Sequence, residues 1–295
     1  MNKTEIQALI SLLDDPDEEV FGHIKDKLLS MGNPIIPDLE SAWENCFDTI
    51  IQNRIENIIH KIQFEATLKE LIVWAKSKDQ DLLEGSILIS RYQYPDLDEK
   101  KLRKKIEQVK QDVWIEINQN LTALEKVKII NHIVFDVHSF SGNTSNYHAP
   151  QNSYLNNVLE SKKGNPLSLS LLYTIIAQDL DLPIYGVNLP EHFILAYKDE
   201  EHILPVEHGD DADSILFYIN PFSRGTVFGR KEIDAFLKQL KLPPDLVHYL
   251  PCSNVDMIIR MLRNLINSYD RLGYAPKKEE LTIILETLTK AKQEF

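Results

Sequence analysis

The stretch from Gly164 to Leu180, which begins GNPLSLSLLYTIIAQ, constrains the fold more than any other part of the chain. Asn165 is a favourable helix N-cap, and Pro166 suits the first helical position, where its missing N–H would have no partner anyway. The leucines and isoleucines that follow lie on almost every side of a 3.6-residue period, with uncharged polar residues filling most positions between them. We therefore expect a central helix that other elements enclose.

After Pro183 the hydrophobic pattern changes to the two-residue period of β-strands, with turn residues between the apolar runs. One buried helix laid on a small antiparallel sheet is therefore the expected unit at the centre of the chain. Because helical patterns precede and follow it, the predicted fold class is α+β and mostly helical. The expected strands cover Tyr185–Leu189, His192–Tyr197, Ile203–Val206 and Leu216–Asn220.

The first part of the chain is predicted to be helical almost throughout. Between Glu5 and Phe64 apolar residues recur at helical spacing, and breaks at Asp15–Pro16 and Met31–Pro37 fall at the spacing of helix hairpins. This segment resembles HEAT repeats, but two repeats leave an apolar end uncovered. We therefore expect it to pack against the rest of the chain and not to fold alone.

The chain after Gly229 is again predicted to be helical. A pair of helices is expected at Val255–Leu272 and Glu279–Lys290, and its spacing resembles a tetratricopeptide-type hairpin. The sequence thus predicts three domains. They are a HEAT-like helical segment (residues 1–79), the core with the buried helix and sheet (residues 80–229), and a tetratricopeptide-like tail (residues 230–295).

Several motifs in the middle of the chain resemble one family. In order they read FSGNTSNY, PQNSYLNNVLESKKGNPLSLSLLY, GVNLPEHF and INPFSRG, and they cover about residues 80–270. Together they resemble the bacterial SirB-type branch of the transglutaminase-like superfamily, whose core has the cysteine-protease type of fold. In catalytic members the central helix begins with a Cys nucleophile, a following strand opens with a His, and an Asp on the next strand orients that His. The resemblance assigns these three positions to Pro166, His192 and Asn220.

The residue at the nucleophile position matters most for function. A nucleophilic thiolate needs sulfur at a helix N-terminus, and a backbone N–H in the same turn usually holds the oxyanion, but Pro166 supplies neither. Asn220 is less of a departure, because papain-like sites orient their His with Asn. We therefore expect a catalytically silent protein that acts as a protein-interaction or scaffold module. The alternatives are an acyl-transfer or amide-hydrolysing enzyme with a displaced nucleophile, at Ser170 or Cys252, and a small-ligand binding protein that uses the vestigial cleft.

A polar loop with aromatic residues, residues 135–157, directly precedes the central helix and is placed to line a cleft there. Its asparagines can instead cap turns, and its tyrosines can pack on the core. Likewise Ser170 can bond a backbone carbonyl, and Arg224 can fix the turn that ends at Gly225. The possible cleft residues are Asn146, Tyr147, Asn152, Tyr154, Ser170 and Arg224.

Charge and composition bear on the partner. The sequence has 45 acidic and 32 basic residues, a formal net charge of −13, so a nucleic-acid backbone would be repelled on average. His132, His138 and His148 do not repeat at the spacing of metal ligands, and we expect neither a metal nor a cofactor. The expected partner is another protein.

Two features indicate the compartment. Cys46 and Cys252 are far apart in the sequence and outside any CxxC spacing, which favours a reducing environment without structural disulfides. The first residues contain no apolar signal core, and no uninterrupted apolar run approaches about 18 residues, the length of a membrane span. We therefore expect a cytoplasmic protein that does not enter a membrane.

Overall fold

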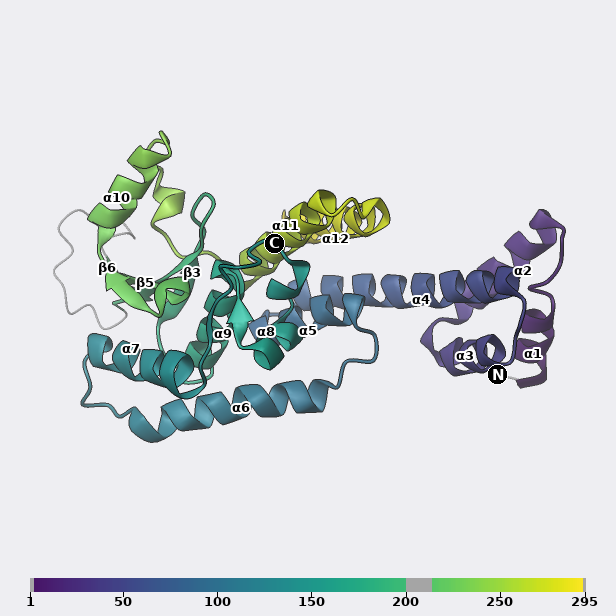
Figure 1. Cartoon of the computed structure of the whole chain (residues 1–295), viewed down its shortest axis with the longest axis horizontal. Coiled ribbons are helices and arrows are strands. Elements are labelled where there is room, and N and C mark those ends of the chain that lie inside the picture. The colour runs from purple at the N-terminus through teal and green to yellow at the C-terminus, as the bar shows by residue number, and fades with distance from the viewer. Residues whose placement is uncertain (1–2, 200–213, 294–295) are drawn as a thin grey trace. The chain divides into compact units, whose positions relative to one another are not determined.

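The computed structural model describes residues 3–199 and 214–293, and Figure 1 shows the chain coloured by residue number. Within these residues, no helix has both the length and the apolar content needed to cross a membrane. The chain forms two compact units. The first consists of Met1–Val73 with Arg91–Pro95, and the second of Trp74–Ser90 with Asp96–Phe295.

Local hydrogen bonds set the helix ends of the first unit. The Asp17 carboxylate caps α2 by accepting a hydrogen bond (2.9 Å) from the backbone N–H two residues later, and Gly32 ends α2 with a left-handed φ of +67°. Arg54 on α4 donates to the carbonyls of Leu13 (2.8 Å) and Asp15 (2.9 Å), so it holds the turn between the first two helices. The helices are α1 (Lys3–Ser11), α2 (Glu18–Met31), α3 (Ile36–Glu44) and α4 (Thr49–Ala75).

The core of the first unit is aliphatic. Its most deeply buried side chains, at 1% exposure or less, come from the turn after α1 through to α4, and α1 itself adds Ile6. The most deeply buried are Leu13, Leu28, Ile35, Leu39, Ile55 and Ile58. The HEAT-like character of this unit and the boundary at residue 79 stay predictions.

The second unit is organised around α9 (Pro166–Gln178), which confirms the expected central helix. Every residue of α9 from Pro166 to Ala177 is buried. Its neighbours include strands of the sheet on one side and helices on the others (Figure 1). The helices before it are α5 (Leu82–Gln93), α6 (Glu99–Glu116), α7 (Ala123–Asn131), which continues into a π-helical turn (His132–Val137), and α8 (Leu155–Ser161).

The main sheet has four antiparallel strands in the order β3-β4-β5-β6, with Gly186 opposite Leu195 and Asn220 opposite Thr226. It follows α9, and strands β3 and β4 contact that helix. The sheet is therefore the small antiparallel layer that the sequence predicts beside the central helix. Its strands are β3 (Ile184–Val187), β4 (Ile194–Lys198), β5 (Ile215–Asn220) and β6 (Thr226–Phe228).

The strand boundaries differ from the prediction near His192. The expected strand His192–Tyr197 is wrong at its start, because β4 begins two residues later, at Ile194. The reason is a turn in which Glu191 adopts a left-handed φ of +56° and the His192 N–H donates to the Leu189 carbonyl (3.4 Å). His192 therefore precedes the strand. The expected strand Ile203–Val206 lies outside the described residues.

A second, two-stranded sheet lies at the start of α9. Strand β1 (Ser141–Gly142) pairs in parallel with β2 (Lys163–Gly164). A side chain at Gly142 would place its Cβ 2.6 Å from the Phe222 ring, and one at Gly164 would place it 2.6 Å from the Ser168 Oγ. These close approaches explain why glycine occupies both positions.

The turn between β5 and β6 is fixed to α7. Gly225 has a left-handed φ of +73°, and its carbonyl accepts a hydrogen bond (2.8 Å) from the Asn131 Nδ2. The buried Tyr173 hydroxyl on α9 donates to the Asn131 Oδ1 (3.1 Å). Asn131 therefore joins α7, α9 and the sheet.

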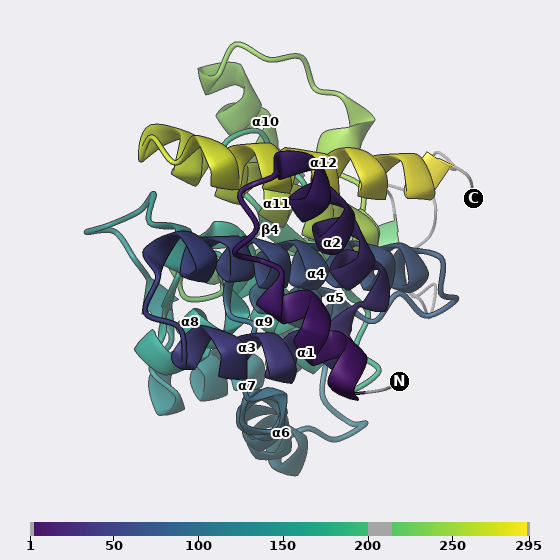
Figure 2. The same cartoon turned by 90° about the vertical axis from the view of Figure 1, so that its right-hand side faces the viewer.

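The last three helices complete the unit. They are α10 (Arg230–Gln239), α11 (Asn254–Arg271) and α12 (Ala275–Gln293), and Figure 2 shows α11 and α12 lying together. Helix α11 also packs on α9, so the expected tail contributes directly to the core. Its tetratricopeptide-like character and the boundary at residue 229 stay predictions.

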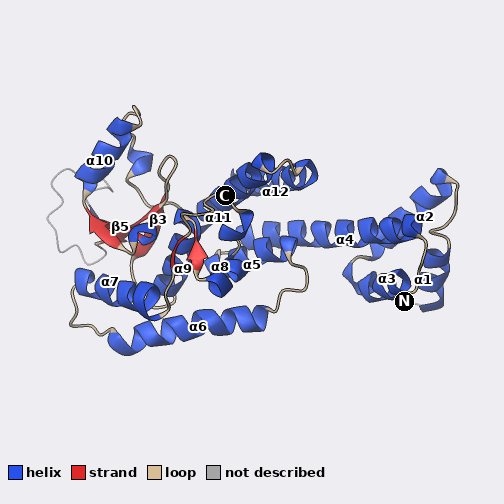
Figure 3. Cartoon of the chain, viewed as in Figure 1, coloured by secondary structure: helices blue, strands red, loops and turns tan. Residues whose placement is uncertain are grey.

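The fold class is α+β and mostly helical, as predicted (Figure 3). The strands gather in one part of the second unit, beside α9. The arrangement brings three separate segments to the start of α9: the loop before α8, the turn before β4, and α11.

Candidate functional site

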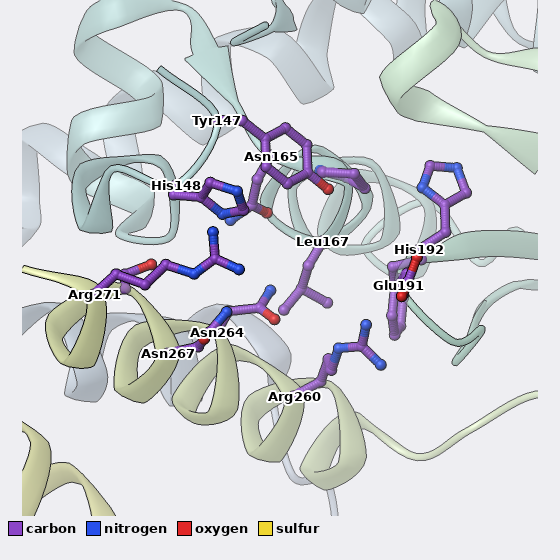
Figure 4. Close-up of a pocket in the computed structure, with 13 residues that line it drawn as sticks. Tyr147, His148, Asn165, Leu167, Glu191, His192, Arg260, Asn264, Asn267 and Arg271 are labelled. Carbon is purple, nitrogen blue, oxygen red and sulfur yellow. The ribbon is translucent and has the colours of Figure 1, made fainter. Parts of the chain in front are cut away.

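A cavity of about 560 Å³ lies in the second unit at the start of α9. Figure 4 shows α11 along one side of it, with Tyr147, His148 and Asn165 facing that helix from the opposite side. We call this cavity the α9 pocket. Its lining residues are Tyr147, His148, Asn165, Pro166, Leu167, Glu191, His192, Phe193, Arg260, Asn264, Asn267, Ser268 and Arg271.

A reciprocal cap holds the start of α9 in place. The Asn165 Oδ1 accepts a hydrogen bond from the Ser168 N–H (2.9 Å), and the Ser168 Oγ accepts one from the Asn165 N–H (2.9 Å). The Asn165 Nδ2 also donates to the Ser153 Oγ (2.9 Å), which ties the cap to the preceding loop. Pro166 is the first residue of the helix and lines the pocket, but it offers no side-chain donor, acceptor or nucleophile there.

His192 lines the pocket from the turn before β4. Burial lowers the pKa of His192 below its ordinary value, a hydrogen bond with the Asn220 side chain acts to raise it, and the positive charge of Arg260 lowers it further. The ring is therefore neutral at neutral pH. In Figure 4 it is directed away from α11. The structure thus places the His192 ring close enough to the Asn220 side chain for it to influence the pKa, with Pro166 and His192 lining one cavity.

Sequence reasoning missed the contribution of α11. Four of its polar residues share one face of the helix at spacings of four, three and four, and all of them line the pocket. The sequence feature that could have revealed them is this periodicity of polar residues within a helix whose other faces are apolar. Nothing in the local pattern, however, indicated which part of the chain the polar face would contact. These residues are Arg260, Asn264, Asn267 and Arg271.

The two arginines of this face differ in their surroundings. The Arg260 Nη1 donates to the Asn188 Oδ1 (2.6 Å) and to the Leu189 carbonyl (3.2 Å), both of which are uncharged acceptors. Burial lowers the pKa of Arg260 below its ordinary value, and neighbouring Arg263 adds to the effect. Arg271 is exposed, at the end of α11, and reaches toward His148 in Figure 4.

Comparison with known proteins identifies the family. A model described as "Transglutaminase-like superfamily" matches residues 100–263, more than half of the chain. The chain belongs to the transglutaminase-like superfamily. No solved structure gives a significant match to it.

Curated proteins give further similarities. A UPF0162 protein of Xylella fastidiosa (strain 9a5c) is 29% identical over 194 residues, and the match spans 64% of this chain and 64% of that protein. F-box only protein 21 of Mus musculus is 32% identical over 110 residues, which is 37% of this chain and 17% of that protein. A UPF0162 protein of Pseudomonas aeruginosa is 40% identical over 55 residues, or 19% of this chain and 20% of that protein. The chain therefore spans a little under two thirds of the Xylella relative.

Of the six expected cleft residues in this transglutaminase-like protein, Tyr147 lines the α9 pocket. Asn152 instead supports the loop, because its Nδ2 donates to the carbonyls of Asn146 (2.6 Å) and Tyr147 (3.1 Å). Tyr154 is buried, and its hydroxyl is 3.2 Å from that of Tyr269. Asn146, Asn152 and Tyr154 therefore have the structural contacts that the sequence allowed as the alternative.

The other two expected cleft residues also have structural partners. The Ser170 Oγ donates to the Pro166 carbonyl (2.8 Å) inside α9, which leaves the hydroxyl bonded within its own helix. Arg224 pairs with Asp136 on the π-helical turn, where the hydrogen bond with His132 lowers the pKa of Asp136 and the ion pair lowers it further. Neither residue lines the α9 pocket.

The thiols of the chain lie outside the pocket as well. Burial raises the pKa of the Cys252 thiol to about 12, and the negative charge of Asp256 adds to the effect. Cys46 belongs to the first unit. Within residues 3–199 and 214–293, no three His, Cys, Asp or Glu side chains come together in a group that could hold a metal ion.

Proposed function

We propose that this protein is a catalytically silent member of the transglutaminase-like superfamily that acts by binding another protein through the α9 pocket. One observation carries the proposal. The first residue of the buried helix, which faces the pocket beside His192, is Pro166. A thiolate nucleophile is impossible there, and so is a backbone N–H that would stabilise an oxyanion.

The state of His192 supports a silent site. In a working cysteine site, the thiolate stabilises an imidazolium beside it, and each ion shifts the pKa of the other. Here burial and Arg260 both lower the pKa of His192, so the neutral ring is favoured. A neutral imidazole can act as a general base, but Pro166, which lines the pocket with it, has no S–H or O–H proton to give up.

A displaced nucleophile is less well supported. Ser170 is hydrogen-bonded inside α9, and the Cys252 thiol is buried with its pKa raised to about 12. Two hydroxyls do line the pocket, those of Tyr147 and Ser268. Burial raises the pKa of Tyr147, which disfavours a phenolate. Ser268 lies on α11, and the His192 ring is directed away from that helix in Figure 4.

The proposed role is that of an interaction module of the SirB-type branch, working in the cytoplasm without a cofactor. The pocket has the volume of a ligand site, roughly 300 to 1,000 Å³, although the reactive atom is missing. We also propose that the first helices are HEAT-like and the last two tetratricopeptide-like, since both repeat types build concave surfaces for protein partners.

An activity assay tests the silent site. Incorporation of a fluorescent primary amine into casein, and release of ammonia from glutamine peptides, should both stay at background, with an active transglutaminase run in parallel as the positive control. Turnover that disappears in His192→Ala would overturn the proposal.

A capture experiment tests the binding role. Asn264→Trp should fill the pocket, whereas Lys290→Trp adds the same side chain to the exposed face of α12. Wild type and Lys290→Trp should retain the same proteins from the cytoplasm of the source cells. We expect Asn264→Trp to lose them. Equal retention by all three would contradict a role for the pocket.

A further inference from the structure

The charge of the α9 pocket is opposite to that of the chain. The whole sequence carries a formal net charge of −13. Among the 13 described residues that line the pocket, Arg260 and Arg271 are the cations and Glu191 is the one carboxylate. Charges beyond about 10 Å are largely screened at physiological salt, so a bound group responds mainly to this lining. The pocket therefore favours an anionic occupant.

The cations of the pocket are not neutralised by the protein. Hydrogen bonds hold Arg260 in place, but its acceptors are an amide oxygen and a carbonyl oxygen. Within the described residues, no carboxylate lies within ion-pair distance of Arg260 or Arg271. Asp270, the neighbour of Arg271, is instead paired with Lys278 (2.7 Å). Both guanidinium groups therefore remain available to a bound carboxylate.

The spacing of the two arginines indicates an elongated occupant. They are eleven positions apart on α11, which corresponds to about 16 Å along the helix axis. A compact anion such as phosphate is too small to reach both ends. An extended peptide advances about 3.3 Å per residue, so about five residues cover the distance.

The residues between the arginines suit a peptide backbone. Asn264 and Asn267 lie between them on the same face of α11 and line the pocket. Each carboxamide offers both donors and an acceptor, and each residue of an extended chain offers one N–H and one C=O. Tyr147 and Leu167 add apolar surface on the other side, where a peptide would bury its side chains.

We propose that the α9 pocket binds an extended acidic peptide segment of a partner protein, with carboxylates at Arg260 and Arg271 and its backbone on Asn264 and Asn267. This inference rests on the proposed binding function and names the chemistry of the partner. Glu191 lies beside His192 at one end of the pocket and opposes acidic side chains there, so it contributes to the register of the segment.

The test begins with peptides of unbiased sequence. A displayed library of random octapeptides is selected on the full-length protein, and the enriched sequences are made with a fluorescein label for anisotropy titrations. We expect enrichment of two acidic residues three to five positions apart. Enrichment of non-acidic sequences, or no enrichment, would overturn the inference.

Charge variants then locate the binding site. Arg271→Gln should weaken binding of the enriched peptide at least tenfold. Arg271→Glu should abolish binding of that peptide, but it should bind a version of the peptide in which one acidic residue is changed to Lys. Arg271 is exposed at the end of α11, so these changes spare the core. Arg263→Gln is the matched control, because Arg263 lies on the same helix but does not line the α9 pocket. Equal loss in the control would contradict the assignment.

One variant should change the affinity for the acidic peptide in the opposite direction. Glu191→Gln removes the carboxylate of the pocket and should tighten binding of the acidic peptide severalfold. Weaker binding would contradict the charge argument. Different results contradict the two proposals. Turnover in the activity assay would contradict the proposed catalytically silent binding function. If Asn264→Trp abolishes capture of a partner but the library yields no acidic peptides, the binding function stands and only the proposal of an acidic peptide is contradicted.

Discussion

The starts of α9 and α11 are two helix N-termini in the same unit, and each has half of what a cysteine nucleophile needs. The start of α9 lines a pocket beside His192 but has Pro166 in place of sulfur. The start of α11 has sulfur, since Cys252 directly precedes the N-cap Ser253. There, however, Cys252 is half-buried, and burial together with the negative charge of Asp256 raises the pKa of its thiol to about 12.

The difference shows that sulfur near a helix N-terminus is not sufficient for reactivity. The positive end of the helix dipole lowers a thiol pKa by an amount that burial can exceed several times over. Cys252 has the dipole but lies outside the pocket, and the largest effect of a neighbouring charge on its pKa comes from the negative Asp256. Reactivity is therefore set by solvent access and neighbouring charge, and the α9 start has the better environment for it.

The largest expected effect concerns Cys252. With a pKa of about 12, its thiolate population at pH 7.5 should lie roughly a thousandfold below that of an ordinary thiol with a pKa near about 8.5. Iodoacetamide labelling, measured site by site with mass spectrometry, should be slower than in urea-unfolded protein by a similar factor. Labelling within tenfold of the unfolded rate would contradict a buried thiol.

Placing sulfur at the other helix start should have the opposite effect. Pro166→Cys, in a background with Cys46→Ser and Cys252→Ser, should create a thiol whose pKa lies below the ordinary value, because the helix dipole and His192 favour the anion. We expect alkylation at pH 7 about tenfold faster than for free cysteine, since only roughly 3% of an ordinary thiol is ionised there.

His192→Ala in the same background serves as the control and should reverse part of that gain. A thiol that reacts like free cysteine, and that is unaffected by His192→Ala, would mean that Pro166 does not occupy the nucleophile position.

A smaller effect concerns the packing at the α9 start. Gly164→Ala would place a Cβ 2.6 Å from the Ser168 Oγ and 3.1 Å from the Leu169 Cγ, which disrupts the cap. We expect a loss of about 1 to 3 kcal/mol in the free energy of unfolding, measured by urea titration. Gly229→Ala is the matched control, because its nearest contact would be an ordinary 3.6 Å. Equal midpoints for both variants would contradict the tight approach.

The smallest effect is a pair of opposite shifts in the pKa of His192. The Asn220 hydrogen bond raises this pKa and Arg260 lowers it. Asn220→Ala should therefore move the NMR titration of His192 to lower pH, and Arg260→Gln should move it to higher pH. Shifts of the same sign would contradict this environment.

The same environment sets a pH dependence of stability. Burial holds the pKa of folded His192 below the ordinary value of about 6.5. As the pH falls through that range, the unfolded chain takes up the proton first. The stability that His192 contributes is therefore fully present above pH 6.5 and is lost toward the lowered pKa.

The sequence predicted the elements whose pattern is local. The apolar residues on all sides of α9 and the cap at Asn165–Pro166 were sufficient to predict a buried helix, because caps and periodicity depend on residues a few positions apart. The strand before Glu191 was predicted two residues too long, to Leu189 instead of Val187. A non-glycine residue with a left-handed φ gives no sequence signal of its turn.

The polar side of the site could not be predicted in the same way. Periodicity shows which face of α11 is buried, but the pocket depends on where the opposite face meets a loop more than 100 residues earlier in the chain. The pattern around Asn152 favoured a turn over a ligand contact, and its hydrogen bonds to the carbonyls of Asn146 and Tyr147 agree with the turn. Long-range contacts therefore determine the site, and local patterns determine the helices that carry it.

The Asn131 link between α7 and the turn at Gly225 has a consequence for the order of folding. Each strand of the main sheet pairs with the next strand along the chain, whereas the Asn131–Gly225 hydrogen bond joins residues 94 positions apart. The entropy lost in closing a loop grows with its length, so neighbouring strands pair at a lower entropic cost than this link. We therefore expect the sheet to assemble first and α7 to dock last, which makes the Asn131 side chain a reporter of the final folding step.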